Sequence, residues 1–412
     1  MNVPKGFKQT EVGVIPEDWE VKTISDVATV TTGPFGTLLK ASEYSELEGV
    51  PLISVGEIGA GSFKVSETTP RIPSQVVRRL PQYVLKTGDI VFGRKGAVDR
   101  SALVSCVENG WFLGSDGIRI RPTIRYHSSY LACQFQGHSV KAILLQNAIG
   151  TTMPSLNQSI LKHILLPIPP RAEQEAIAAA LSDMDALIEG VEKLLEKKRR
   201  IKQGAMQELL KPKKGWKQIF LGSIADILTG FPFPSSGYSD DGIKLLRGSN
   251  VKRGNINWSK KNTKYWKVIT HDIKPYELQA GDIVIAMDGS LVGKSFAQIS
   301  EDDLPALLLQ RVTRIRTDKV DINYICHLVC GKYFTIHCEQ IKTSSAIPHI
   351  SPKDIRDFQI PLPPTRVEQT AIAAILSDMN KEIEQVETQL TKYRQLKTGM
   401  MQELLTGKKR LV

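Results

Sequence analysis

Residues 173–189 read EQEAIAAALSDMDALIE, and residues 368–384 read EQTAIAAILSDMNKEIE. The correspondence continues without gaps across residues 171–214 and 366–409, where 27 of 44 positions are identical. A proline-rich tract precedes each copy, LLPIPP in one case and IPLPP in the other. A repeat of this length indicates that the chain consists of two related halves, each of which ends in the same helical segment.

The blocks in front of the two helical segments also correspond, although more weakly. Short β-branched runs follow a Gly-Asp turn in both blocks, which predicts strands. One helix is expected in each block, over residues 130–147 and near 324–340. The corresponding segments are YVLKTGDIVFGRKG (83–96) with YELQAGDIVIAMDG (276–289), GIRIRP (117–122) with VTRIRT (312–317), and WEVKTISDVATVTTG (19–33) with WKQIFLGSIADILTG (216–230).

The order block, helix, block, helix predicts an α+β fold. Two similar strand-rich α/β domains are expected, separated by two long antiparallel coiled-coil helices with pseudo-two-fold symmetry. Joining the C-terminus to the N-terminus would recreate the internal junction, so the termini are expected to lie near each other. The predicted segments are a first domain at 1–166, a first helix at 167–213, a second domain at 214–360 and a second helix at 361–412.

Apolar residues in both helical segments recur every 3.5 residues, which is the spacing of a coiled-coil seam. The prolines in front fix the helix starts, and each helix is expected to run about 38 residues, or roughly 57 Å. The first seam is expected to drift toward Leu194, Ile201 and Ala205. The alternative is two separate amphipathic helices, each packed on its own block. The predicted seam residues are Ile177, Leu181, Met184, Ile188, Val191 and Leu195, with Ile372, Leu376, Met379, Ile383, Val386, Leu390 and Tyr393 in the second copy.

The composition is that of an ordinary globular protein with a net charge of +11. A strong positive excess favours a polyanionic partner, nucleic acid first, although a merely basic protein is the simpler interpretation. The sequence contains no apolar run long enough for a membrane span and no apolar signal core at its start. Five cysteines in a chain of 412 residues fit a reducing compartment, which predicts a cytoplasmic location.

Three motifs suggest catalytic or metal chemistry, and each is incomplete. GSLVGKS (289–295) has one residue too few between its glycines for a phosphate loop, and a strand-like run follows it. EDWEVK (17–22) contains the E-x-K spacing of some nucleases, but a metal nuclease also needs an acidic residue on a separate strand, and Asp18 is too close in sequence to serve. The spacing of Cys326, His327, Cys330, His337 and Cys338 is loose for zinc, so buried thiols are the better interpretation. We therefore predict a protein that is not an enzyme and has neither a catalytic residue, a metal nor a cofactor.

Binding of double-stranded DNA remains as the best interpretation. Polar residues that differ between the blocks fall in the Gly-flanked loop after GDIV, where Arg and Lys can read guanine, Asp can accept from cytosine, and Ser can serve either. Basic and aromatic residues also alternate in KRGNINWSKKNTKYWK (252–267). Arginines on the RIR strands could meet phosphates or be plain surface charge. The candidate DNA contacts are Arg94, Lys95, Arg100, Arg119, Arg121, Arg247, Lys252, Arg253, Ser290, Lys294, Arg314 and Arg316.

The sequence resembles the specificity subunits of type I restriction–modification systems along essentially its whole length. The resemblance is carried by FKQTEVGVIPEDWEV (7–21) and by the paired tracts LPIPPRAEQEAIAAALSDMD (166–185) and IPLPPTRVEQTAIAAILSDMN (360–380). The endings KQGAMQELL (202–210) and KTGMMQELL (397–405) also belong to it. Thr365 is an extra residue in the second proline tract, which is a mild departure from the pattern.

The resemblance implies a non-catalytic subunit in which each of two target recognition domains reads one half of a bipartite, asymmetric DNA site. It further implies that the helices set the spacing of the half-sites and bind two methyltransferase subunits, and that restriction subunits join the complex. S-adenosylmethionine and ATP would then belong to those partners. The alternative is a standalone sequence-specific or architectural DNA-binding protein, which would bind its site well without partner subunits.

Overall fold

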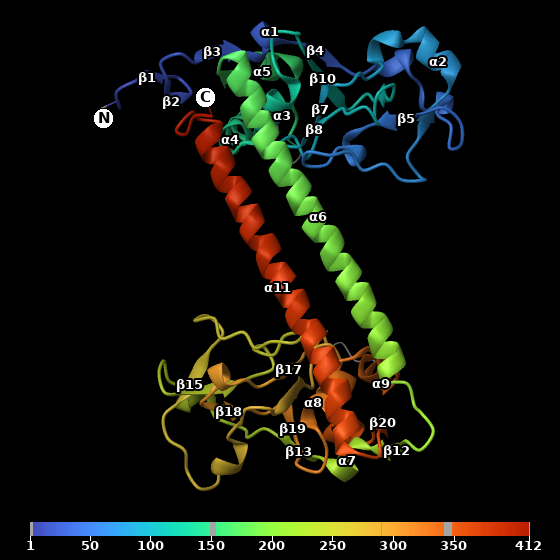
Figure 1. The fold of residues 1–412 in the computed structure, drawn as a ribbon, viewed down its shortest axis with the longest axis vertical. Coiled ribbons are helices and arrows are strands. Elements are labelled where there is room, and N and C mark those ends of the chain that lie inside the picture. The colour runs from blue at the N-terminus through green and yellow to red at the C-terminus, as the bar shows by residue number, and fades with distance from the viewer. Residues whose placement is uncertain (1–2, 149–153, 290, 342–347, 412) are drawn as a thin grey trace. The chain divides into compact units, whose positions relative to one another are not determined.

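The computed structural model describes residues 3–148, 154–289, 291–341 and 348–411. The chain divides into two compact units. Unit 1 comprises Met1–Glu192 with Thr388–Val412, and unit 2 comprises Lys193–Glu387. The two long helices, α6 (Arg171–Leu209) and α11 (Arg366–Leu404), each contribute residues to both units (Figure 1).

The two units share the same strand topology, as the internal repeat predicts. Their four-stranded sheets have the orders β4-β10-β7-β8 and β13-β19-β16-β17, and their three-stranded sheets have the orders β6-β5-β9 and β15-β14-β18. In each unit, a strand near the start of the block pairs antiparallel with the strand of the proline tract that precedes the long helix. These pairs are β3 with β11 and β12 with β20. The hairpin β1-β2 (Phe7–Thr10, Gly13–Pro16) precedes them in unit 1.

The strands that follow the Gly-Asp turns of GDIV, and the strands that carry RIR, lie where the sequence predicts them. The strands of unit 1 are β3 (Glu20–Thr23), β4 (Ala28–Thr32), β5 (Val50–Ile53), β6 (Arg71–Ile72), β7 (Ile90–Gly93), β8 (Ser101–Leu103), β9 (Phe112–Leu113), β10 (Gly117–Pro122) and β11 (Leu165–Ile168). Those of unit 2 are β12 (Lys217–Phe220), β13 (Asp226–Thr229), β14 (Ile243–Leu246), β15 (Lys264–Trp266), β16 (Ile283–Ala286), β17 (Phe296–Gln298), β18 (Ala306–Leu308), β19 (Val312–Arg316) and β20 (Gln359–Leu362).

The prediction of one helix per block after the RIR strand is wrong, because each of these helices is broken. In unit 1 the break falls at Gly137, whose extended backbone ends one helix and begins the next. In unit 2 it falls between Val329 and Lys332. The helices of unit 1 are α1 (Ile24–Val27), α2 (Ser74–Arg79), α3 (Ser128–Gln136), α4 (His138–Asn147) and α5 (Gln158–Lys162), and those of unit 2 are α7 (Leu221–Ile224), α8 (Ile322–Val329), α9 (Lys332–Ile341) and α10 (Pro352–Arg356).

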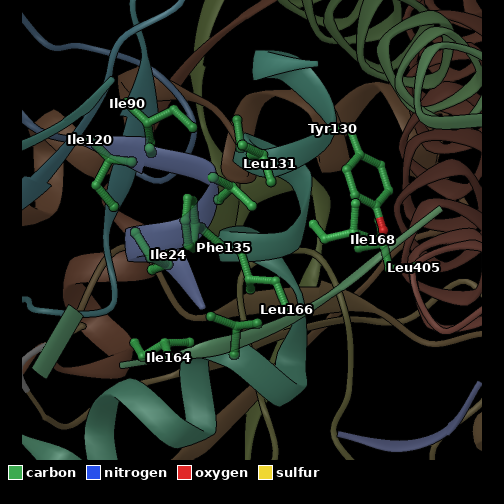
Figure 2. Close-up of a cluster of buried hydrophobic side chains, with 14 of the residues drawn as sticks. Ile24, Ile90, Ile120, Tyr130, Leu131, Phe135, Ile164, Leu166, Ile168 and Leu405 are labelled. Carbon is green, nitrogen blue, oxygen red and sulfur yellow. The ribbon is translucent and has the colours of Figure 1, made fainter. Parts of the chain in front are cut away.

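The core of unit 1 forms where α3 covers one face of the four-stranded sheet. Figure 2 shows Phe135 and Leu131 of α3 beside Ile90 and Ile120, which come from neighbouring strands. The other face of the same sheet is also covered, because Val91 belongs to a second buried cluster. Unit 2 repeats this arrangement with its own two clusters. Both faces of each four-stranded sheet are therefore buried, which decides the role of its polar residues.

Parts of the two long helices lie antiparallel within each unit. In unit 1, Lys397 pairs with Asp185 and Arg394 pairs with Glu192 (2.6 Å). In unit 2, Lys198 pairs with Glu382 (2.7 Å) in the same antiparallel sense, and Arg199 pairs with Glu387 there. Ion pairs between largely exposed side chains contribute little to stability. They show how the two helices are aligned, but they do not by themselves hold the helices in that alignment.

The seam between the helices is apolar, as the heptad spacing predicts. The seam residues are buried or half-buried in both copies, from Ile177 to Leu195 and from Ile372 to Tyr393. The expected drift of the first seam is wrong for Leu194 and Ile201, which are exposed (41% and 52%), whereas Ala205 is half-buried against the core of unit 2. Lys202 occupies a half-buried seam position instead, as its long apolar stem allows.

The C-terminal end of the chain lies beside the N-terminal segment in unit 1, which confirms the expected proximity of the termini (Figure 1). The carboxylate of Glu173 is fully buried at the start of α6. It accepts hydrogen bonds from the indole of Trp19 (2.9 Å) and from the guanidinium of Arg410 (2.6 and 2.8 Å). Arg410 also binds Asp18 (2.7 Å), which holds the pKa of that carboxyl below its usual value. In unit 2, Trp216 donates to Glu368 (3.3 Å) in the equivalent way.

Arg410→Met should lower the free energy of unfolding by about 2–3 kcal/mol, because it leaves the buried carboxylate of Glu173 without its counter-charge. Urea denaturation of the full chain measures this loss. The double variant Arg410→Met with Glu173→Gln is the control, and it should regain part of the stability because no buried charge remains. Equal stability of Arg410→Met and the unmodified chain would contradict this role for the C-terminal arginine.

Candidate nucleic-acid interface

The first arginine of each RIR strand is buried inside its domain. Arg119 donates to the backbone oxygen of Gln82 (2.7 Å) and to the hydroxyl of Thr31 (2.9 Å). Arg314 donates to the backbone oxygen of Pro275 (3.3 Å) and pairs with Asp226. Burial lowers the pKa of both guanidinium groups from its ordinary value. These two arginines cannot reach a phosphate.

The second arginine of each RIR strand binds the aspartate of the GDIV motif through two hydrogen bonds. Arg121 binds Asp89 at 2.6 and 2.7 Å, and Arg316 binds Asp282 at 2.6 Å through both oxygens. Both carboxylates are about 1% exposed, and each also accepts a backbone N–H from three positions earlier (2.8 Å). We call each pair the strand brace of its unit, because it joins the GDIV turn to the RIR strand.

The expectation that Arg119 and Arg314 meet phosphates or form plain surface charge is corrected, because both side chains are buried. Arg121 and Arg316 are about 31% exposed, and their contact with phosphates stays a prediction. A second buried cluster covers the face of the sheet from which these side chains project. A buried arginine needs hydrogen-bond partners, and the braces, nearby side chains and backbone oxygens supply most of them. The Nε atoms of Arg119 and Arg314 have no partner among the described residues. The four arginines thus stabilise the scaffold from which the adjacent loop projects.

The loop after GDIV carries the same ion pair in both units, with the charges exchanged. In unit 1, Lys95 lies 3.6 Å from Asp116. In unit 2 the aligned positions are Asp288 and Arg311, which form an ion pair at 2.8 Å. We call Lys95–Asp116 and Asp288–Arg311 the tip pairs. Each tip is also held at its glycine, whose N–H bonds to the oxygen of the proline before α5 or α10 (2.8 and 3.0 Å).

Other predicted residues of these loops differ between the units. The guanidinium of Arg94 lies over the ring of Phe35, 4.3 Å from its centroid, whereas the aligned Met287 is buried. Arg100 is exposed at the end of the first loop. Lys294 is exposed in the second loop and lies 3.6 Å from Glu339. Ser290 lies outside the described residues.

The basic and aromatic segment at 252–267 divides into two kinds of residue. Lys252 and Arg253 are exposed, while Arg247 is half-buried and donates to the hydroxyl of Ser249 (3.0 Å). The tryptophans face inward: Trp258 donates to Asp303 (2.7 Å), and Trp266 packs edge-on against an aromatic neighbour. Their rings support the domain, and the candidate surface consists of the basic side chains.

The cysteine and histidine cluster of unit 2 does not converge on one point. His327 contacts the hydroxyl of Ser377 (3.0 Å), His337 contacts a backbone oxygen of α10 (2.9 Å), and Cys338 is buried in the core. Among the described residues, the structure contains no group of three or more His, Cys, Asp or Glu side chains placed to hold a metal. Strand β17 follows the GSLVGKS loop, as expected. No helix in the described ranges is long and apolar enough to cross a membrane.

Two clefts lie at equivalent places in the two units. The first has a volume of about 820 Å³ and lies between the α3–α4 junction at Gly137 and Met401 of α11. The second has a volume of about 880 Å³ and lies between the α8–α9 junction at Gly331 and Met206 of α6. Each cleft thus borders the C-terminal part of a long helix, and the sequence did not indicate either one.

The tip pairs and strand braces are also features that the sequence analysis missed. Alignment of the two blocks places Lys95 over Asp288 and Asp116 over Arg311, so the exchange of charge is visible in the repeat. Asp89 and Asp282 stood in the GDIV motif, but nothing local indicated their arginine partners about 30 positions later. A search for positions at which the two aligned blocks carry opposite charges would have identified the residues of the tip pairs.

Comparison with known proteins gives one family along most of the chain. The model described as "Type I restriction modification DNA specificity domain" matches twice, at residues 16–198 and 213–392. The specificity subunit of the type I restriction enzyme MjaVIII from Methanocaldococcus jannaschii is 27% identical over 99% of this chain and 96% of its own length. The EcoKI specificity subunit from Escherichia coli K12 is 23% identical over 92% of this chain and 85% of its own length.

Solved structures show the same fold. The crystal structure of a type I restriction–modification S subunit from M. genitalium matches with a TM-score of 0.62 at 14% identity, covering 98% of both chains. A chain from a study of complex assembly and conformational transition of the type I restriction–modification system matches with a TM-score of 0.53 at 16% identity. It covers 95% of this chain and 99% of its own length.

Asp89→Asn and Asp282→Asn should each lower the free energy of unfolding by about 2–4 kcal/mol, because each leaves a partly buried arginine without its carboxylate. Chemical denaturation measures the loss, and Asp116→Asn at an exposed tip is the control, with a change below about 0.5 kcal/mol. The salt dependence of DNA binding by the folded variants should stay unchanged. Normal stability together with a shallower salt dependence would instead place these arginines on phosphates.

Proposed function

The chain belongs to the type I restriction–modification DNA specificity family, and from this membership we propose that each of its units reads one half of a bipartite, asymmetric DNA site. It is a specificity subunit with two target recognition domains, a non-catalytic role in DNA recognition. We assign the recognition domains to residues 1–166 and 214–360, and the spacer helices to residues 167–213 and 361–412.

The exchange of charge between the two tip pairs is the observation that carries this proposal. In each unit the loop follows a strand held by the strand brace, and a glycine at the equivalent position anchors the loop. The two tips are therefore presented on equivalent scaffolds. Lys95 can donate to guanine in the major groove, whereas Asp288 can accept from the amino group of cytosine. Both oxygens of Asp288 also have protein partners, Arg311 and His349, so a base would share this carboxylate with them. Two domains with one fold, whose tip pairs carry the cation and the anion at exchanged positions, are suited to two different half-sites.

Exposed and half-buried cations around the tips supply the less specific part of the proposed interface. Phosphate contacts fix the register of a protein on the duplex, and they make its affinity depend on salt. The proposed phosphate contacts are Arg94, Arg100, Arg247, Lys252, Arg253 and Lys294. Arg94 is held over Phe35, so its orientation is set before DNA binds.

We further propose that the length of α6 and α11 sets the distance between the two half-sites, which we call the ruler proposal. Each helix has 39 residues, which corresponds to about 58 Å at 1.5 Å per residue. This length exceeds one turn of DNA, about 34 Å, so one duplex can meet both domains. An apolar seam and antiparallel ion pairs within each unit support a stiff pair of helices.

Specificity subunits of type I systems act together with other subunits and with DNA. We propose two methyltransferase subunits, one for each copy of the conserved helical surface, with restriction subunits joining through the assembled complex. The two equivalent clefts beside α6 and α11 support this duplication. S-adenosylmethionine and ATP would bind the partners, and the complex would act in the cytoplasm on DNA.

Lys95→Ala and Asp288→Ala should each relax recognition of one half-site and leave the other unchanged. A well-placed polar contact to a base contributes about 1–3 kcal/mol of discrimination, so each variant should methylate additional sequences in one half only. Sequencing of modified bases on DNA treated with the assembled methyltransferase complex gives the result. Each variant is the control for the other. Relaxation of both halves by one variant, or of neither half by both variants, would contradict the assignment of one tip to each half.

Removal of one heptad from each helix should shorten the gap between the half-sites without changing either half. Deletion of residues 189–195 from α6 and of 388–394 from α11 removes facing heptads and keeps the seam in phase. Seven residues span about 10 Å, so the gap should shrink by at most about three base pairs. Deletion of four residues from one helix alone is the control, and it should abolish site-specific methylation by breaking the seam. An unaltered gap in the matched deletion would defeat the ruler proposal.

A further inference from the structure

The cleft of unit 2 contains a pair of thiols that the cleft of unit 1 lacks. Cys326 lies on α8 and Cys330 is the C-cap residue of the same helix, and their sulfur atoms are 3.6 Å apart. Both line the cleft of about 880 Å³. At the aligned positions of unit 1 the sequence has Ala132 and Gln136. The dithiol is therefore a local addition to a shared scaffold.

A second difference between the clefts concerns the lysine on the neighbouring long helix. In unit 1, Lys397 is paired with Asp185. In unit 2 the aligned residues are Lys202 and Asn380, so the carboxylate is replaced by an amide at this position. Burial lowers the pKa of Lys202 from its ordinary value, and the charge of Arg253 acts in the same direction. Glu384 and the thiolate form of either cysteine act in the opposite direction. Lys202 thus places a positive charge beside the dithiol.

We propose that Cys326 and Cys330 form a peroxide-sensitive dithiol, a modification site at which hydrogen peroxide converts the two thiols into a disulfide. The site is open through the cleft to a small oxidant, and both sulfurs are within reach of each other. This inference is independent of the DNA-reading role, because it concerns a cleft whose dithiol has no counterpart in the other half.

The geometry separates the roles of the two sulfurs. The two sulfurs lie within hydrogen-bond distance, and either thiol can donate. When Cys330 donates, this bond, together with the charge of Lys202, lowers the pKa of Cys326. The same bond and burial raise the pKa of Cys330. Since the thiolate is the nucleophile, Cys326 attacks the oxidant and Cys330 resolves the product.

The reaction balances in two steps. The Cys326 thiolate, which has given its proton to water, attacks one peroxide oxygen, the O–O bond breaks, and the leaving hydroxide takes up a proton to become water. This step gives a sulfenic acid. The sulfur of Cys330 then attacks the sulfur of Cys326, the S–O bond breaks, and the hydroxide leaves as water with the Cys330 proton. Both sulfurs are oxidised, both peroxide oxygens are reduced, and the products are one disulfide and two waters.

The place of Cys330 at the end of α8 makes the bond geometrically accessible. The sulfurs must approach from 3.6 Å to about 2 Å, and a C-cap residue can move more readily than one inside the helix. Unit 1 offers a natural comparison in Cys133, a half-buried thiol on α3. Burial raises the pKa of Cys133 to about 11, so it should react slowly.

The test treats the full reduced chain with hydrogen peroxide at neutral pH, blocks remaining thiols with an alkylating reagent, and follows each cysteine by peptide mass spectrometry. A Cys326–Cys330 disulfide, lighter by two hydrogens and reversed by a dithiol reductant, should form before Cys133 is modified. Lys202→Met should slow its formation about threefold, since the smaller thiolate fraction is partly offset by higher nucleophilicity. Cys330→Ser should stop at a sulfenic acid that dimedone traps on Cys326.

Lys397→Met is the matched control, because it changes the equivalent lysine in the other cleft and should leave the rate at Cys326 unchanged. Circular dichroism confirms that each variant is folded before its rate is compared. Absence of the disulfide, oxidation of Cys133 at an equal rate, or an unchanged rate in Lys202→Met would each overturn the proposal.

Discussion

A buried ion pair that occurs once in each unit holds the strand from which the variable loop projects. Asp89 with Arg121, and Asp282 with Arg316, join the turn before one central strand to the neighbouring strand of the same sheet. Each pair leaves almost no carboxylate surface in water, so removal of one partner costs far more than the pair contributes. The loop after GDIV therefore varies in sequence while its base stays in place.

The duplication separates what is shared from what differs. The long helices, the sheet orders and the hydrogen bond from a tryptophan indole to a glutamate at the helix start are shared. The loop tips, the clefts and the closing arginine differ. Arg410 has no equivalent arginine in unit 2, because the aligned residue there is Gly215. The chain thus carries two different surfaces on one scaffold, as the proposed recognition of two unlike half-sites requires.

The sequence predicted the architecture because the relevant signals are periodic or repeated. Heptad spacing located both seams, and the aligned GDIV and RIR segments located the central strands. The failures have physical causes. Lys202 lies in a seam because its long apolar stem can be buried there, and a hydropathy pattern does not detect this. The RIR arginines were counted among the candidate phosphate contacts, because the sequence does not show that a buried cluster covers each face of the sheet. The break at Gly137 depends on one residue's backbone conformation.

The central claim is that each block carries its own recognition on an interchangeable scaffold. A chain in which residues 214–360 are replaced by a second copy of residues 17–166 tests it most directly, because Trp19 then takes the place of Trp216 at the junction. Sequencing of the bases methylated by the complex assembled with this chain gives the site. The account predicts a symmetric site made of two inverted copies of the half read by the first block. An asymmetric site that retains the half read by the second block would contradict it.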